Sequence, residues 1–332
     1  MDPVTQGVLG ATLAQAASKP KLIIGATLLG IAGGMAPDLD VLIRSETDPL
    51  LYLEYHRQFT HSLFFIPFGG VLVGLLMHAL LGRHCGLRLW QSLLFATLGY
   101  ATHALLDACT TYGTQLLWPF SNARIAWNTL SIIDPLYTLP LLGLVITAAV
   151  KKRPQLGRIA LAWALIYPGI GALQRERAEA LGWEIAAARG HEPVRLEAKP
   201  SFANLLVWKI VYETEDRYFV DAVRVGINSR TYPGQHVAKL DIPRDLPWLD
   251  PASQQAQDIE RFRWFSNGYI ARDPEHPNRV VDIRYSVIPN EIKALWGIEL
   301  NPGADPRQHV RYHAGRDTGQ RNRDKFWQMV FD

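Results

Sequence analysis

The sequence predicts an α-helical membrane bundle of about six spanning or near-spanning helices, followed by a small extramembrane α+β domain with an antiparallel sheet. The first observation is that apolar runs fill the chain before about Arg175, whereas charged residues are interspersed throughout the rest. The second is that some runs, such as residues 63–82, reach the roughly 20 residues that a crossing helix needs. The third is a set of alternating, strand-like segments after residue 204. These observations predict a membrane-embedded helical domain with a metal site at 1–174, a connecting helix at 175–190 and an extramembrane domain at 191–332.

Composition narrows the function classes. The net charge of +3 is too small to indicate a nucleic-acid partner. Membrane lipids are the expected surroundings because of the apolar runs. The two cysteines, Cys85 and Cys109, offer neither a disulfide framework nor a Cys-x-x-Cys zinc site. The N-terminus lacks a basic region followed by a cleavage site, so we expect no removable signal peptide.

Three of the connections between the predicted helices are short, and the two others are longer loops at residues 37–62 and 107–135. The first two helices are rich in Gly and Ala, which lets two helix backbones approach closely. Pro67 lies near the start of the third, where a missing amide is best tolerated. The segments cover residues 4–17, 22–36, 63–82, 89–106, 136–150 and 159–173.

Lys and Arg residues orient this bundle. Most of them fall in three connections on one side, which are expected to be cytoplasmic because short positive loops stay inside. Both termini and the C-terminal domain would then be periplasmic, although Arg175 and Arg177 count mildly against this orientation. The positive residues of the inner connections are Lys19, Lys21, Arg83, Arg88, Lys151, Lys152, Arg153 and Arg158.

The fourth helix ends with a histidine and a carboxylate. His103 and Asp107 are four residues apart and therefore share one helix face. Imidazole nitrogen and carboxylate oxygen are both metal ligands, and ionisable groups at membrane depth usually face a cavity or a partner. The alternative is a helix-end histidine that is hydrogen-bonded to a neighbour.

Further donors fall at the same outer face. Asp38 and Asp40 follow the second helix, and two carboxylates so close repel each other unless a cation lies between them. His56 and His61 can approach one centre if a helix starts near Thr60 and leaves His56 on the loop. The set would suffice for one four-coordinate divalent ion, with zinc expected, or for two ions that share a bridging carboxylate.

Polar residues near these donors are candidates for catalysis. Arg57 and Arg124 could hold a phosphate or stabilise a developing charge. Asp134, at a helix start, is either a partner that orients a ligand histidine or a helix cap. The side chains expected to line the pocket are Tyr112, Gln115, Ser121 and Asn128.

The C-terminal half predicts a β-hairpin from residues 204–212 and 217–225 around a turn at 213–216. A helix is expected from Asp250 to Phe265, and further strands at 279–287 and 309–313. The scattered histidines of this half are interpreted as surface or structural residues. Its Trp and Arg residues are interpreted as core and salt bridges rather than as a lipid-facing rim or a ligand groove.

Four motifs carry a resemblance: Pro-Asp-Leu-Asp, His-Arg-x-x-Thr-His-Ser, His-x-x-x-Asp and Tyr-Gly followed by Pro-Phe-Ser. Residues 1 to about 150 resemble the YdjM/YbcI-type family of bacterial inner-membrane proteins, which are described as predicted metal-dependent hydrolases. The resemblance implies a multi-pass inner-membrane protein. It implies ligand roles for Asp38 or Asp40, His56, His61, His103 and Asp107.

The chain departs from the family pattern at one position. Many members have a histidine where this chain has Gln6. Glutamine is a much poorer transition-metal ligand, so this position would be missing or replaced by water. The His-x-x-x-Asp element is also similar, more distantly, to that of zinc-dependent phospholipases C.

The leading hypothesis is a membrane-bound metal-dependent hydrolase that attacks an ester or phosphoester of a lipid or lipid-linked substrate at the periplasmic face. A metal-ion transporter would place its ligands near the bilayer midplane, which the helix-end positions disfavour. A metal-binding scaffold without hydrolytic activity is the third class. An intramembrane zinc protease is disfavoured because no His-Glu-x-x-His occurs.

Overall fold

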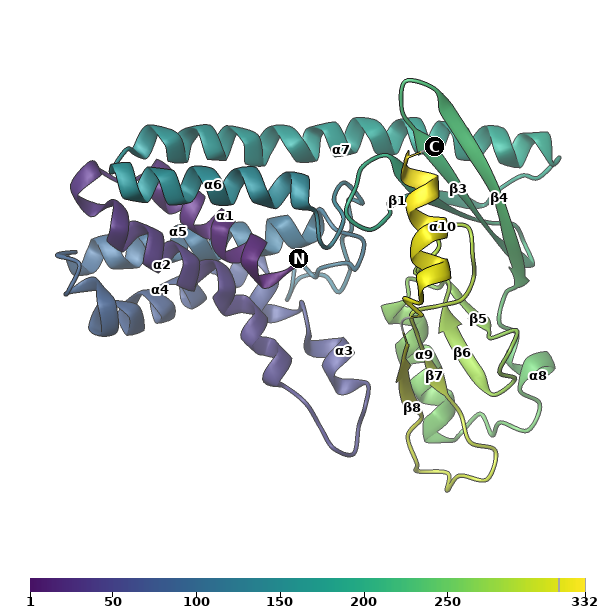
Figure 1. Ribbon diagram of the computed structural model, residues 1–332. Helices are drawn as coiled ribbons and strands as arrows, with labels where there is room; N and C mark the ends of the chain where they lie inside the picture. Colours follow the sequence, from purple (N-terminus) through teal and green to yellow (C-terminus); the bar gives the residue numbers. More distant parts are fainter. Residues whose placement is uncertain (316, 332) are drawn as a thin grey trace. The chain divides into compact units, whose positions relative to one another are not determined.

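The computed structural model describes residues 1–315 and 317–331, which form two compact units (Figure 1). The N-terminal unit comprises Met1–Leu42, Tyr55–Leu173 and Phe202–Asn204. The C-terminal unit comprises Gln174–Ser201 and Leu205–Asp332, and it also includes the early segment Ile43–Glu54.

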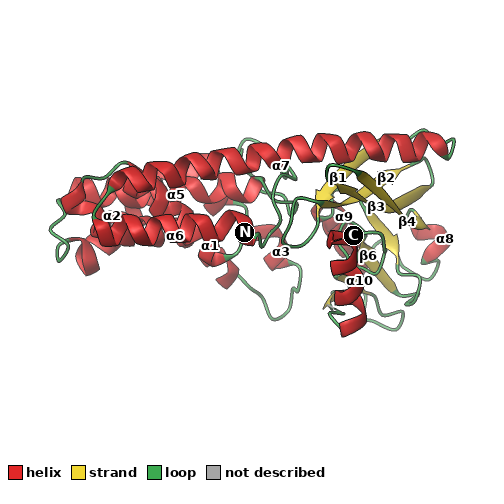
Figure 2. Cartoon of the chain, turned by 45° about the horizontal axis from the view of Figure 1, so that its top comes forward, coloured by secondary structure: helices red, strands yellow, loops and turns green. Residues whose placement is uncertain are grey.

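The N-terminal unit is a helical bundle (Figure 2). All six predicted segments are helical, and short 3-10 or π-helical turns extend two of them. The elements are α1 (Pro3–Ala16), η1 (Pro20–Leu22), α2 (Ile23–Met35), η2 (Ala36–Leu42), α3 (Leu51–Tyr55), η3 (Phe59–His61), η4 (Leu63–Phe65), α4 (Ile66–Met77), η5 (His78–Gly82), α5 (Leu89–Ala108), α6 (Pro135–Lys151) and α7 (Pro154–Ala188).

The structure supports fewer membrane crossings than the six predicted. Within the described residues, three helical stretches are long and apolar enough to cross a membrane: Pro20–Leu42, Leu63–Gly82 and Pro154–Ala188. Pro135–Lys151 is apolar but shorter. The helical and apolar character is therefore confirmed, and the number of crossings stays a prediction.

Local signals explain where several helices begin. The Asp2 side chain accepts a hydrogen bond from the Thr5 amide (3.0 Å) at the start of α1, and Pro3 occupies the first turn. Ser62 accepts from the Phe65 amide (3.2 Å) in the same way before α4. Such side chains satisfy amides that lack a partner within the helix.

Glycines set the distance between the helices that carry the polar donors. A Cβ atom on Gly30 of α2 would lie 2.5 Å from the Gly10 carbonyl oxygen of α1. A Cβ atom on Gly99 of α5 would lie 2.3 Å from the Gly30 carbonyl oxygen. Both contacts are with backbone, so only glycine permits this approach. The packing brings the end of α5 beside η2.

The C-terminal unit contains two four-stranded antiparallel sheets, with orders β1-β2-β3-β4 and β5-β6-β7-β8. The prediction of a single sheet is therefore corrected to two. The helices are α8 (Ile242–Asp245), α9 (Gln254–Phe265) and α10 (Gln320–Phe331). The strands are β1 (Arg195–Pro200), β2 (Val207–Glu213), β3 (Arg217–Val225), β4 (Ser229–Ala238), β5 (Ile270–Arg272), β6 (Arg279–Asp282), β7 (Trp296–Glu299) and β8 (Arg311–Ala314).

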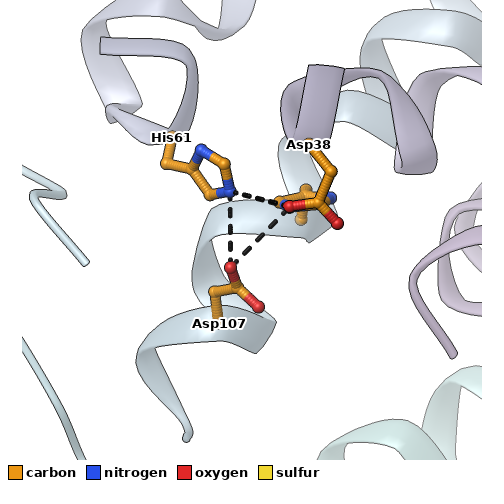
Figure 3. A group of neighbouring side chains, drawn as sticks. Asp38, His61 and Asp107 are labelled. Carbon is orange, nitrogen blue, oxygen red and sulfur yellow. Dashed lines mark hydrogen bonds and ion pairs between the residues drawn. The ribbon is translucent and has the colours of Figure 1, made fainter. Parts of the chain in front are cut away.

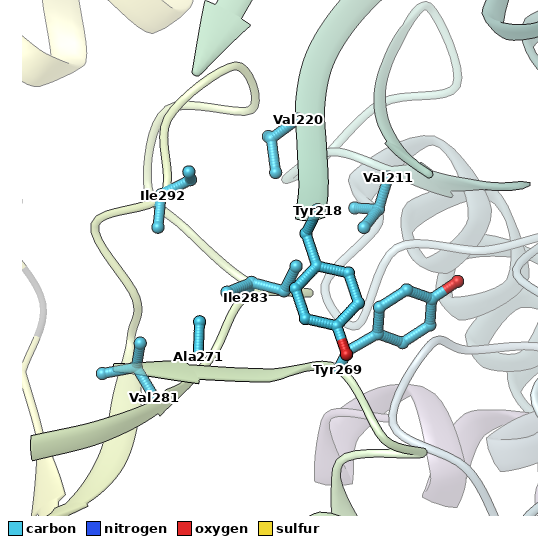
Figure 4. Packing of buried hydrophobic residues seen from close by; sticks show 8 residues of the cluster. All are labelled: Val211, Tyr218, Val220, Tyr269, Ala271, Val281, Ile283 and Ile292. Atoms are coloured by element: carbon cyan, nitrogen blue, oxygen red, sulfur yellow. The ribbon is translucent and has the colours of Figure 1, made fainter. Parts of the chain in front are cut away.

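The strands of both sheets contribute to one buried apolar cluster (Figure 4). Val211 and Val220 come from the first sheet, and Ala271 and Val281 come from the second. The predicted hairpin is confirmed as β2 and β3, which pair from Val207↔Arg224 to Glu213↔Tyr218. The predicted strand at 279–287 is shorter, because Asp282 accepts hydrogen bonds from the Arg284 amide and guanidinium and the chain turns there.

The close approach at Gly99 can be tested by substitution. We expect Gly99→Ala to lower the midpoint of thermal unfolding in detergent, because overpacking against backbone costs about 1–3 kcal/mol. Gly143→Ala in α6 is the matched control, because a Cβ atom there would meet nothing within 4 Å. Equal unfolding midpoints for the two variants would contradict the packing argument.

Candidate metal centre

The candidate site forms where three separate segments of the N-terminal unit end or turn (Figure 3). Asp38 and Asp40 lie on η2, directly after α2. His61 ends η3, and His56 lies on the loop before it, as expected from a helix start near Thr60. His103 and Asp107 lie on the last turns of α5 and are fully buried.

Four donors converge at the centre: Asp38, His61, His103 and Asp107 can each offer one ligand atom within 4.8 Å of the others. The two Nε2 atoms of His61 and His103 are 2.9 Å apart. His61 Nε2 lies 3.4 Å from Asp38 Oδ1 and 3.3 Å from Asp107 Oδ2. Ligands bound to zinc at 2.0–2.1 Å in a tetrahedron are about 3.3 Å apart. The distances from His61 to the two carboxylates match this spacing, and the two Nε2 atoms would have to separate by a few tenths of an ångström around a four-coordinate ion.

The outer nitrogens of both rings have acceptors. His103 Nδ1 lies 2.6 Å from the Gly34 carbonyl oxygen, which can only accept, so Nδ1 carries the proton of that bond. His61 Nδ1 lies 3.2 Å from Asp40 Oδ2. With a proton on each Nδ1, both Nε2 atoms face the centre. Metal-bound histidines are oriented by a carbonyl or a carboxylate in the same way.

The charge balance of the centre favours a cation. Burial lowers the pKa of His61, but hydrogen bonds with Asp107, Asp38 and Asp40 outweigh it and raise the pKa to about 10. The carboxylates thus hold a positive charge at this imidazole. This positive charge can be supplied by a proton shared between the two Nε2 atoms or by a metal ion bound to both.

A second group shares one member with the first. Asp38, Asp40 and His56 also offer ligand atoms within 4.8 Å of one another. His56 Nδ1 lies 2.8 Å from Asp40 Oδ1. The Asp38 side chain is 26% exposed, whereas those of His61 and Asp40 are fully buried. Asp38 therefore lies where the site is open, and it belongs to both groups.

Arg57 joins the site through its backbone and its side chain. Its amide donates to Asp40 Oδ2 (3.0 Å), and its Nε lies 2.9 Å from Asp107 Oδ2. Its φ of 65° is in the left-handed region, which is unfavourable for residues other than glycine. The guanidinium also lies 4.7 Å from the centre of the Tyr112 ring. This predicted catalytic residue therefore contacts two of the predicted ligands.

The other two predicted catalytic residues lie farther from the centre. Arg124 lies 5.3 Å from the centre of the same Tyr112 ring and donates to the Gly113 carbonyl (3.0 Å), so both arginines contact one aromatic ring. Asp134 accepts from the Tyr137 amide (3.2 Å) and the Tyr167 hydroxyl (2.9 Å) at the start of α6. Those contacts favour the helix cap over the alternative of orienting a ligand histidine.

Two residues of the site had no role in the sequence prediction. Thr60 Oγ1 donates to Asp40 Oδ2 (2.9 Å) and lies 3.0 Å from His61 Nδ1. The Tyr100 hydroxyl donates to the Thr60 carbonyl (2.8 Å). The position of Thr60 directly before His61 was an available signal. Tyr100 lies one turn before His103 on α5, but its contact with Thr60 depends on packing between segments 40 residues apart.

Gln6 lies against the ligand carboxylate. Its Nε2 donates to Asp107 Oδ1 (2.9 Å), and the amino group of Met1 contacts the same oxygen. Among the described residues, no hydrogen-bond partner is found for the buried Oε1 of Gln6. Residue 6 is thus adjacent to the centre, and a polar atom there is left without a protein partner.

Comparison with known proteins places the chain in a family. The model of the family described as YdjM inner membrane protein matches residues 1–178, more than half of the sequence. The chain belongs to the YdjM family. All residues of the candidate metal centre fall within this match, and the family and the apolar helices indicate an inner-membrane protein.

Two relatives of this YdjM family member are similar over different lengths. The uncharacterized protein YfhP of Bacillus subtilis is 24% identical over 301 residues, which cover 86% of this chain and 87% of YfhP. The inner membrane protein YbcI of Escherichia coli is 33% identical over 132 residues, which cover 37% of this chain and 69% of YbcI. No solved structure matches the chain.

Metal content tests the centre directly. We expect His103→Ala and Asp107→Ala each to lose at least one metal ion per chain, because each removes a donor from the central group. Elemental analysis of detergent-purified protein measures this loss. His84→Ala is the control, because His84 is an exposed histidine outside both groups. Unchanged metal content in both site variants would contradict the site.

Residue 6 can be used to tune the centre. We expect Gln6→His to tighten Zn²⁺ binding by about tenfold, because it places an imidazole beside Asp107 where an amide now lies. Gln6→Ala, which removes the amide without adding a ligand, is the comparison. Competition with a chromophoric chelator measures the affinity, and equal affinities for all three proteins would show that residue 6 does not reach the ion.

Proposed function

We propose that this protein is a membrane-bound metal-dependent hydrolase that acts on an ester or phosphoester of a lipid or lipid-linked substrate at the periplasmic face. The observation that carries the proposal is the convergence of His61 Nε2, His103 Nε2 and the carboxylates of Asp38 and Asp107. A divalent ion held there, which we expect to be zinc, would lower the pKa of a bound water so that it can attack at neutral pH.

The donor set supports one or two ions. The central group and the group of Asp38, Asp40 and His56 share the Asp38 carboxylate, and a carboxylate between two groups is suited to bridge two ions. Two-ion sites are typical of enzymes that cleave phosphoesters. This arrangement favours a phosphoester among the candidate substrates.

The residues around the donors have separable tasks. Asp40 and the Gly34 carbonyl hold the His61 and His103 rings in orientation. Arg57 balances the charge of Asp107. Together with Arg124, which contacts the same Tyr112 ring, it adds positive charge for an anionic substrate. The partly exposed Asp38 lies on the side from which a substrate would enter.

Aromatic side chains near the site support a lipid substrate. Phe64 and Phe68 lie just after His61, and the Phe64 ring contacts that of Phe120, which is 82% exposed. The Leu63 amide donates to the Leu116 carbonyl (2.9 Å), which holds the segment before Phe120 against this helix start. Exposed apolar side chains that gather in this way are typical of a surface that contacts a membrane or a lipid, so the site would lie near lipid.

Hydrolysis can be tested on the full-length protein in detergent. We expect the Zn²⁺-loaded protein to release product from bis(4-nitrophenyl) phosphate, 4-nitrophenyl phosphate or vesicles of phosphatidylglycerol. Chelation should abolish the activity and added Zn²⁺ should restore it. His61→Ala should be inactive, and His84→Ala should match the wild type.

The same experiment separates the proposal from its alternative. Three of the four central donors are fully buried, as they would also be around a purely structural ion. Stoichiometric metal binding without hydrolysis of any of these substrates would favour a metal-binding scaffold or a transporter.

A further inference from the structure

We propose that Arg261, a residue of the C-terminal unit, is a positioning residue for the metal ligands and acts through the segment Ile43–Glu54, here called the ligand loop. This inference rests on the metal site of the proposed function and does not depend on hydrolysis. The ligand loop begins three residues after Asp40 and ends two residues before His56.

The ligand loop packs with the C-terminal unit, although the chain on both sides of it belongs to the N-terminal unit. Its residues Leu50 and Leu53 are almost completely buried. The Asp48 carboxylate accepts from the Leu50 amide (3.0 Å) and so caps the turn before α3. The loop is therefore an ordered element and not a free connection.

Arg261 of α9 contacts the loop at two points. Its Nη2 and Nη1 donate to the two oxygens of Asp48 at 2.8 and 3.0 Å, and its Nε donates to Glu54. The bidentate pair is the strongest geometry for such contacts. The three side chains are only 20–32% exposed, which limits screening by water. One guanidinium thus joins two loop residues that are six positions apart.

Arg261 is itself held in place. Its Nη1 donates to Asp258 Oδ1 (2.9 Å), one turn earlier on α9. The Asp258 side chain is fully buried, and its Oδ2 accepts from the Val310 amide (3.1 Å) and lies 2.9 Å from His309 Nδ1. The carboxylate that orients the guanidinium is therefore anchored on a second segment of the C-terminal unit.

The two ends of the ligand loop meet at the metal ligands. Asp40 lies before the loop, and its oxygens contact His56 Nδ1 (2.8 Å) and the Arg57 amide (3.0 Å), which lie after it. Bringing two chain positions together costs less conformational entropy when the segment between them is already ordered. The order that Arg261 imposes on Asp48 and Glu54 thus favours the approach of Asp40 and His56.

A comparison of two arginines on one helix tests this inference. We expect Arg261→Gln to weaken Zn²⁺ binding by about tenfold, the lower limit for loss of groups that orient metal ligands. Amide hydrogen exchange of residues 43–57 should become faster. Arg263→Gln is the matched control, because Arg263 pairs with Glu260 of the same helix at 3.1 Å and should change neither readout. Chelator competition on full-length protein in detergent gives the affinity.

Further variants separate positioning from a folding defect. Asp48→Asn with Glu54→Gln removes both loop charges that face Arg261 but leaves the Arg261–Asp258 pair, and it should weaken Zn²⁺ binding as Arg261→Gln does. The charge exchange of Arg261→Asp with Asp48→Arg should recover part of the affinity that each single change loses. Wild-type affinity in both Arg261→Gln and the loop double variant would overturn the inference. A wild-type protein that binds no Zn²⁺ would instead overturn the proposed function.

Discussion

The need for positive charge between buried carboxylates is the constraint on which the helical unit depends. Asp40 and Asp107 are buried beside His61, and Asp38 is largely so. Carboxylates placed so closely are costly in a medium of low dielectric constant unless a cation separates them. The Arg57 guanidinium compensates Asp107 from one side, and a cation held by the two imidazoles, Asp38 and Asp107 would compensate the remaining charge.

The helix packing serves this arrangement. The glycine contacts of α1, α2 and α5 bring the Gly34 carbonyl within reach of His103 and the end of α5 within reach of η2. Arg57 adopts a left-handed backbone conformation, which costs about 1–3 kcal/mol. In that conformation its amide donates to Asp40 while its side chain pairs with Asp107, so the strained residue makes both contacts.

The parts of the site that depend on local spacing could be predicted from the sequence. His103 and Asp107 share a helix face because of the helical repeat, and the apolar runs marked the helical segments. Contacts that depend on packing between distant segments could not be predicted. Tyr100 reaches Thr60 across 40 residues and Tyr167 reaches Asp134 across 33. The ligand loop gave no signal either, because nothing in its twelve residues identifies a distant partner such as Arg261. The division of the C-terminal strands into two sheets likewise follows from long-range pairing.

The partial exposure of Asp38 has a consequence for how an ion would arrive. A structural zinc enclosed on all sides is acquired while the chain folds and leaves only when it unfolds. Here one carboxylate faces outward while its companions stay inside. An ion could therefore enter and leave past Asp38 while the protein stays folded, so occupancy would depend on the concentration of free ions near this side chain.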